Sequence, residues 1–289
     1  MHSTGRSRRA IGAVMMYAAY ILLMAFIVFP LIWMLLMSFK NPTDVMAIPP
    51  KLFFKPTLDN YIRLFFGRQR EGYALVKSDF PLAMKNTIII AGGATIVSMI
   101  TGTLAGYALA RLRFAARDFL AFTILSLRFS PPLSMIIPVY ILYRRIGLYN
   151  THVGLMLIYQ IISMPIIIWV VRSYIESVPV DLEQAAWIDG YSWWQGFSKV
   201  LFPLIAPGVA ATSVLAFVFC WNNFVFGLML GAAETHTLTV ATSAFISYEQ
   251  VLWGQMAAAS VVTIIPAMIF IFLVQRWVVR GLTFGAVKG

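Results

Sequence analysis

The feature that constrains this chain most is a series of long segments with almost no charged side chains. Crossing roughly 30 Å of hydrocarbon takes about 20 helical residues, and each of these segments is long enough to do so. Their apolar runs are continuous rather than alternating, so we expect helices with internally bonded backbones and not membrane β-strands. The segments are 10–39, 86–110, 146–171, 200–233, 250–275 and 119–143, and the last contains Arg128 as its one charge.

Composition supports the same class of protein. Hydrophobic residues make up 60% of the 289, charged residues 11%, and the mean hydropathy is +0.82, which is outside the usual range of soluble domains. We therefore predict an all-α integral membrane protein that forms a single transmembrane domain over residues 1–289. Its six helices are expected at about 13–38, 86–110, 119–143, 152–174, 205–230 and 255–279.

Prolines interrupt several of these predicted spans. Pro131, Pro132 and Pro138 lie in the third span, Pro165 in the fourth and Pro266 in the sixth. Proline removes a backbone donor and commonly bends a helix, so we expect bends at these places. The second span instead carries small residues at four-residue spacing, namely Gly102, Gly106 and Ala110, which predict close approach by another helix.

Chemical motifs are missing from the sequence. There is no GxxxxGK[ST] phosphate loop and no HExxH, and the three histidines are far apart. Cys220 is the one cysteine and lies in the fifth span, so neither a disulfide nor a cysteine-based metal site is expected. We therefore predict that the chain is not an enzyme and holds no cofactor or metal of its own.

Charge gives a weak indication of orientation. Arg6, Arg8 and Arg9 precede the first span, and Arg111, Arg113 and Arg117 follow the second. These clusters favour a membrane orientation with both termini in the cytoplasm, although basic residues elsewhere nearly balance them.

A polar segment separates the fourth and fifth spans and reads DLEQAAWIDGYSWWQGFSKVLFPLIAP, residues 181–207. Asp181 is placed to cap a short helix and Gly190 to end it. The small Ala185 and Ala186 would let another protein approach closely. Pro203 and Pro207 predict the place where the next transmembrane helix begins.

The spacing within this segment resembles the EAA loop of bacterial ABC importer permeases. That loop runs Glu, two alanines, Asp-Gly, and an apolar stretch that ends in Pro-x-x-x-Pro. Tyr191 and Phe202 depart from it, where the family usually has Ala and Leu. The matching residues include Glu183, Ala185, Ala186, Asp189, Gly190 and Pro203, and the resemblance implies that they couple the permease to an ATPase subunit.

Other segments resemble sugar-importer permeases related to the maltose-type second permease subunit. The resemblance covers nearly the whole chain and rests on SFKNPTD, TLDNYIRLF, YALARLRF, SPPLSMIIPVYILYRRIGLYNT, AFVFCWNNFVFGL and GLTFGAVKG. It implies a multi-pass subunit of the bacterial inner membrane with its EAA loop, residues 176–207, in the cytoplasm.

The same resemblance implies partners for the chain. They are a second homologous permease, an extracytoplasmic solute-binding protein that delivers a sugar or sugar-like solute, and two ATP-binding subunits that hold ATP and Mg. Closure of the ATPase pair would then drive alternating access in the permeases.

Two alternatives remain open at this stage. The chain could be an ABC permease for another small solute, or a stand-alone secondary transporter. Membrane-buried carboxylates or inverted repeats would favour the secondary transporter. All eleven Asp and Glu residues lie outside the six predicted spans, which is against that reading.

The polar residues inside the spans are candidates for the solute pathway. Trp221, Asn222, Asn223 and Phe224 lie in the fifth predicted span, where they would line a gate or pair with neighbouring helices. Because the resemblance assigns most sugar contacts to the other permease, a gate is expected rather than a full binding site. Arg128 would meet carbonyls freed by Pro131 and Pro132, or an anionic group of the solute or partner.

Overall fold

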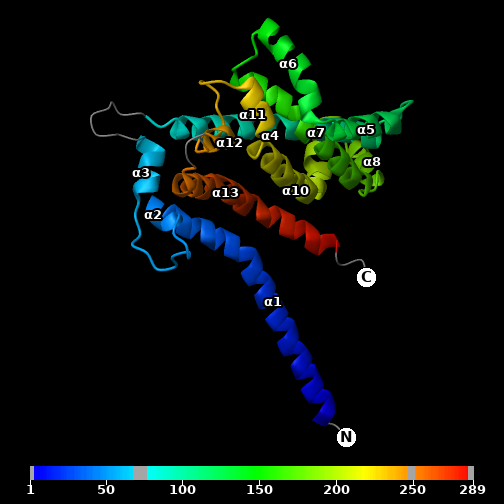
Figure 1. Cartoon of the computed structure of the whole chain (residues 1–289). Helices are drawn as coiled ribbons and strands as arrows, with labels where there is room; N and C mark the ends of the chain where they lie inside the picture. The colour runs from blue at the N-terminus through cyan, green and yellow to red at the C-terminus, as the bar shows by residue number, and fades with distance from the viewer. Residues whose placement is uncertain (1–2, 68–76, 247–250, 286–289) are drawn as a thin grey trace. The chain divides into compact units, whose positions relative to one another are not determined.

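The computed structural model describes residues 3–67, 77–246 and 251–285, without the side chains of 3–11 and 278–285. In these ranges the regular elements are helices, apart from one isolated β-bridge between Ile246 and Val251, so the predicted all-α class is confirmed. The long helices are α1 (Ser3–Ser38), α4 (Phe80–Arg111), α7 (His152–Glu176), α10 (Phe202–Trp221) and α13 (Trp253–Gly285) (Figure 1). The shorter elements are α2 (Pro42–Val45), α3 (Asp59–Phe66), α5 (Arg117–Ser126), the 3-10 turn η1 (Leu127–Phe129), α6 (Pro132–Ile146), α8 (Asp181–Ile188), α9 (Trp193–Gln195), the π-helical η2 (Gly196–Leu201), α11 (Val225–Leu230) and α12 (Leu238–Ser243).

The chain groups into two compact units. Unit 1 is Met1–Ser78 with Phe245–Val262, and unit 2 is Asp79–Ala244 with Thr263–Gly289. Helix α13 contributes its first part to unit 1 and its remainder to unit 2.

Six spans were predicted, and within the described residues five helices are long and apolar enough to cross a membrane. The third predicted span is a pair of helices, Arg117–Phe129 and Pro132–Ile146, bent by 95°, which makes a sixth span if the pair crosses the membrane as one and is otherwise a re-entrant loop (Figure 1). The break lies at Pro131 and Pro132, as the sequence indicated. A residue before proline is pushed into the extended region, and Ser130 adopts ψ 127° there. By contrast, α7 and α13 continue through Pro165 and Pro266.

The fifth predicted span, 205–230, was wrong at both ends. The continuous helical run begins at Trp193, where Ser192 forms a capping box with Gln195, and it ends at Trp221. The run passes through the π-helical turn η2 before α10 begins at Phe202, so Pro203 lies in the first turn of α10, as predicted, but the span as a whole begins earlier. In a π-turn the backbone hydrogen bonds run i→i+5 instead of i→i+4. Such a turn can accommodate a following proline, which has no backbone N–H to donate.

Helices α4, α7 and α10 form the centre of unit 2. A Cβ at Gly102 would lie 2.6 Å from Ile167 Cγ2, and one at Gly106 would lie 3.3 Å from the Ile168 carbonyl oxygen. The predicted small-residue stripe therefore does hold a second helix, α7, close to α4. The buried cluster beside it consists of Tyr107, Ile167, Val171, Ile175, Phe197, Leu201, Ile205 and Ala216.

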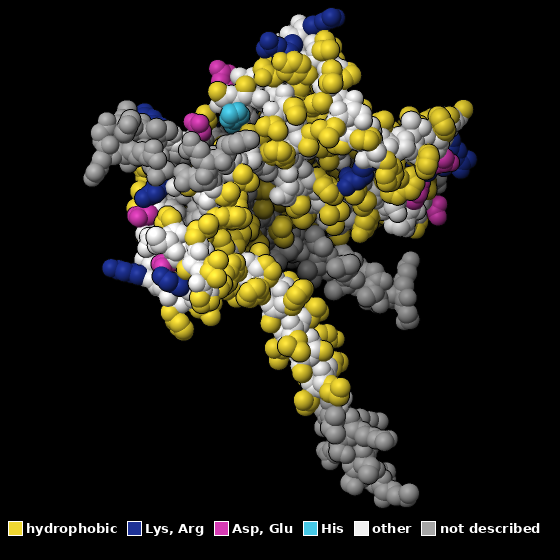
Figure 2. Space-filling model, viewed as in Figure 1, with side chains coloured by type: hydrophobic (Ala, Val, Ile, Leu, Met, Phe, Trp, Pro, Cys, Tyr) yellow, Lys and Arg dark blue, Asp and Glu magenta, His cyan; other side chains and the backbone are white. Residues whose placement is uncertain are grey.

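Hydrophobic side chains remain exposed over much of the molecule. Figure 2 shows them along the described part of α1 and over much of the visible face of unit 2. In α1 only 6% of the most apolar window is buried. Lipid tails would cover such a surface in a membrane, whereas contiguous patches of this size are rare on monomeric soluble proteins.

In unit 1, the end of α1 is joined to α3 by one buried amide. Asn60 donates from Nδ2 to the carbonyl oxygens of Ser38 and Lys40, both at 2.9 Å. The Lys40 ammonium is buried as well and donates to the Lys51 carbonyl at 2.6 Å. The two bonds from Asn60 satisfy backbone acceptors that the end of α1 leaves open.

Candidate functional site

The segment that resembles the EAA loop forms the short helix α8 and the turn that ends it. Val180 is the N-cap residue, so the prediction that Asp181 caps this helix was wrong by one position, and Asp181 lies in the first turn. Gly190 ends the helix with φ +86°, as predicted. Its N–H donates to Trp187 O and that of Tyr191 to Ala186 O, which is the Schellman pattern.

Glu183 is buried, although the motif alone suggested a contact with a partner. Its side chain is 2% exposed, and Oε1 accepts from Arg111 Nε at 2.6 Å. Oε2 accepts from the Tyr107 hydroxyl at 3.1 Å. Both carboxylate oxygens are therefore bonded to groups at the end of α4. A buried carboxylate needs such partners, because desolvation of an unpaired charge is costly.

Arg111 and Tyr107 join this carboxylate to further elements. Arg111 Nη2 donates to Val178 O at 2.8 Å, just after α7. The Tyr107 hydroxyl accepts from Trp193 Nε1 at 3.0 Å, and the Tyr107 ring meets the rings of Trp193 and Phe197 edge-on at 5.3 and 5.4 Å. The side chains of Tyr107, Arg111, Glu183 and Trp193, here called the α8 anchor, connect α4, α8 and α9.

The opposite face of α8 is exposed. At 100° per residue, Asp181, Gln184, Ala185 and Ile188 lie on the side away from the buried Glu183 and Ala186. Ile188 is 85% exposed, which is unusual for an isoleucine outside a lipid-covered span. Asp189 and Gly190 are exposed at the end of the helix, and Pro203 is exposed in the first turn of α10.

The predicted gate residues are likewise partly buried and partly exposed. Trp221 is buried and donates from Nε1 to Thr263 O at 3.2 Å. Asn222 is exposed and donates to Val218 O in its own helix at 2.9 Å. Asn223 Oδ1 accepts from Phe226 N at 3.1 Å in the first turn of α11, while Phe224, the N-cap residue of that helix, is exposed. The bonds of both amides are thus local, which explains why α10 ends here.

Arg128 has a different carbonyl partner from the one expected. Its Nη1 donates to Ile162 O of α7 at 3.1 Å, and its guanidinium lies 4.2 Å from the ring centre of Phe219 in α10. The prediction of carbonyls freed by Pro131 and Pro132 was therefore wrong. Ile162 lies in the turn of α7 before Pro165, although the carbonyl that Pro165 leaves without its intrahelical donor is that of Ile161.

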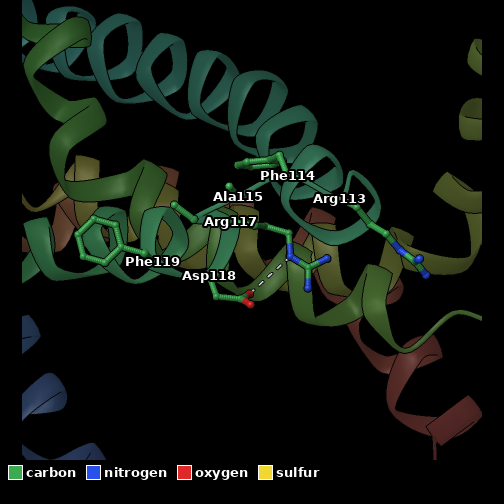
Figure 3. A pocket seen from close by; sticks show the side chains of 7 residues that line it. Arg113, Phe114, Ala115, Arg117, Asp118 and Phe119 are labelled. Atoms are coloured by element: carbon green, nitrogen blue, oxygen red, sulfur yellow. Dashed lines mark ion pairs between the residues drawn. The ribbon is translucent and has the colours of Figure 1, made fainter.

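A hollow of about 560 Å³ lies in the turn between α4 and α5, and Arg113 to Phe119 line it (Figure 3). Arg117 pairs with Asp118 at 3.6 Å, and Asp118 also pairs with Arg172 of α7. None of the predicted site residues lies in this hollow. Among the described residues, no group of three or more His, Cys, Asp or Glu could hold a metal ion.

Sequence reasoning missed Tyr107, Arg111 and Trp193 as partners of the motif. Tyr107 and Arg111 belong to YALARLRF, which contributed to the resemblance without a role for either residue. They are 76 and 72 residues from Glu183 in the chain, so no local spacing could relate them to it.

Comparison with known proteins identifies the family. The family model for the binding-protein-dependent transport system inner membrane component matches residues 98–284. The trehalose/maltose transport system permease protein MalG of Thermococcus litoralis is 34% identical over 272 residues, which covers 93% of this chain and 94% of the relative. The sulfoquinovosyl glycerol transport system permease protein SmoH of Agrobacterium fabrum is 33% identical over 291 residues, covering 99% and 98%.

A solved structure shares the fold. It is a bacterial ABC transporter involved in the import of the acidic polysaccharide alginate, with a TM-score of 0.73, 24% identity and coverage of 94% of this chain and 97% of that one. The predicted fold and family are confirmed. The chain belongs to the binding-protein-dependent transport system inner membrane components and is a multi-pass permease subunit of an ABC importer.

Proposed function

We propose that this permease moves a sugar or sugar-like solute across the bacterial inner membrane, and that α8 is its docking helix for an ATPase subunit. The solute class is supported by relatives named for trehalose, maltose and sulfoquinovosyl glycerol. The complex would contain a second homologous permease, two ATP-binding subunits and an extracytoplasmic binding protein. A solved alginate transporter in complex with its pentasaccharide-bound periplasmic protein is a precedent for the last of these.

The observation that carries the docking role is the exposed face of α8. Asp181, Gln184, Ala185 and Ile188 offer a small, partly apolar surface on a helix whose other face is fixed by buried contacts. The small side chain of Ala185 allows a partner to approach the helix closely, and Ile188 supplies an apolar contact. Asp189, Gly190 and Pro203 would help by holding the end of this surface in place.

Substitution of Ala185 by Trp tests this role. A bulky side chain at the centre of the contact should lower capture of the ATPase subunits by about tenfold. The chain should still insert, because Ala185 is exposed. Ala233→Trp is the matched control, since Ala233 is exposed in the turn before α12 and should leave capture unchanged. Equal capture by both variants would show that the face is not a docking surface.

The same proposal places both termini and α8 in the cytoplasm. In a Cys220→Ala background, Ser192→Cys should be protected from reagents that cannot cross the membrane, because Ser192 begins α9 beside α8. Ala233→Cys should react with those reagents. Labelling with the opposite pattern would reverse the orientation.

For the solute pathway we assign a gate role to the end of α10. Asn222 and Phe224 are the exposed members of the segment, whereas Trp221 and Asn223 are held by contacts within the chain. An aromatic ring and an amide are the groups that sugars use for stacking and hydrogen bonding. Arg128, fixed between α7 and α10, would position the neighbouring span.

A further inference from the structure

Both carboxylate oxygens of Glu183 are bonded inside the chain. Arg111 and Tyr107 each bond one of its oxygens, and the side chains of Glu183 and Arg111 are 2% and 9% exposed. A side chain buried to this degree presents almost no surface to a partner. We propose that Glu183 is an internal positioning residue, which makes α8 move together with α4, and is not itself a contact with the ATPase. The inference rests on the proposed docking role of α8.

The anchor has the geometry that such a role requires. Arg111 is the last residue of α4 and also bonds Val178 O, so one guanidinium holds both the segment between α7 and α8 and α8 itself. A displacement of α8 by an ATPase would therefore reach the end of α4 through a short charge-assisted bond.

A second route leads from the same point into α10. Tyr107 accepts a hydrogen bond from Trp193, which begins the helical run that continues as α10. Trp193 stacks on Phe197 at 5.9 Å, and Trp187 lies beside Gly196 at the start of η2. The buried carboxylate thus lies where the routes to α4 and α10 meet, which is the place for a residue that converts docking into movement of the spans.

Double substitution of a buried ion pair can distinguish an internal positioning role of Glu183 from a direct contact with the ATPase. Removing one partner leaves an uncompensated buried charge and is strongly harmful, whereas replacing both by apolar groups is often tolerated. If Glu183 acts through Arg111, the two sites must therefore be strongly non-additive. If Glu183 instead contacts an ATPase, a change at Arg111 cannot restore what its removal loses.

The experiment compares Glu183→Leu, Arg111→Met and the double variant in the complete complex with its ATPase subunits and binding protein. The readout is ATPase activity stimulated by the solute-loaded binding protein. Each single variant should lose about tenfold or more of the stimulation, and the double variant should return to within about threefold of the wild type. The control pair is Lys51→Met and Asp44→Leu, an ion pair of unit 1 with Lys51 54% exposed, where the effects should be small and additive.

A double variant as inactive as Glu183→Leu would overturn the inference. Thermal unfolding of the same purified chains tests whether misfolding is the cause. If the double variant recovers its Tm but not the stimulation, Glu183 contacts a partner. If it recovers neither, the pair does not act as a unit. A wild-type complex that assembles no ATPase, or shows no stimulation, would instead contradict the proposed function itself.

Discussion

The indole N–H of Trp193 donates to the hydroxyl of Tyr107 at 3.0 Å, and this hydroxyl donates in turn to Glu183. The bond connects the first turn of α9 with the last turn of α4 across 86 residues of sequence. It makes the phenol hydroxyl both acceptor and donor, which is the full use that a buried hydroxyl requires.

Removal of this hydroxyl should destabilise the α8 anchor without unfolding the chain. Tyr107→Phe keeps the ring contacts with Trp193 and Phe197 but leaves Glu183 with one bond fewer and the indole N–H without an acceptor. We expect a loss of about 1–3 kcal/mol in the free energy of unfolding, because the buried carboxylate of Glu183 loses one of its two partners. Thermal unfolding in detergent measures it, and an unchanged Tm would contradict this account of the anchor.

The close approach of α4 and α7 leads to a second prediction. Gly106→Leu should destabilise unit 2 by about 1–3 kcal/mol or more, since its side chain would be forced against the backbone of Ile168 and Arg172. Gly92→Leu is the control in the same helix, because a Cβ there meets nothing within 4 Å. The Tm values of the two variants are compared with that of the wild type. Equal shifts would show that the small-residue stripe of α4 does not set its distance from α7.

A third prediction concerns Asn60, which closes the end of α1. Asn60→Ala removes donors from two carbonyls at once and should cost about 1–3 kcal/mol. Asn60→Asp should cost more, since its carboxylate would face the same two oxygens. The neighbouring Asp59 is exposed, so Asp59→Ala should be nearly neutral. Limited proteolysis of the loop before α3 would measure the loss, and equal sensitivity of the variants would refute the assignment.

Local rules in the sequence predicted the features that local geometry determines. Gly190 ends α8 because only glycine adopts φ +86° without strain, and Gly102 and Gly106 mark the packing face because they lack a side chain. The break at Pro131 and Pro132 follows from the same kind of rule. Each of these properties depends on a few neighbouring residues.

The residues that were misjudged depend on partners far away in the chain. Glu183 looks like a surface residue in its motif, and its burial is set by Arg111, 72 residues earlier. Arg128 bonds a carbonyl of α7 rather than one beside it in sequence. The sequence also did not predict that the helical run starts at Trp193. A π-turn lies before Pro203, and a proline in that position usually indicates the first turn of a helix. Pairing across helices leaves no periodic signal in one sequence.

The last prediction separates the two amides at the end of α10. Asn222 is exposed and bonds only locally to Val218 O in the described part of the chain, so Asn222→Ala should lower solute uptake with little change in Tm. Asn223 Oδ1 accepts from the Phe226 N–H in the first turn of α11, and the backbone carbonyl oxygen of Asn223, which a substitution leaves in place, accepts from the Thr239 hydroxyl at 2.9 Å. Asn223→Ala should therefore cost about 1 kcal/mol of stability in addition, because the Phe226 N–H loses its side-chain acceptor.

Uptake by reconstituted complexes and Tm of the same preparations distinguish these effects, with solute binding to the binding protein as a constant control. Asn223→Asp is the informative companion, because its carboxylate can still accept from the Phe226 N–H and should restore most of the stability that Asn223→Ala loses. If Asn222→Ala transports at the wild-type rate across the range of solute concentrations, the exposed amide does not contribute to the gate, and the solute passes elsewhere.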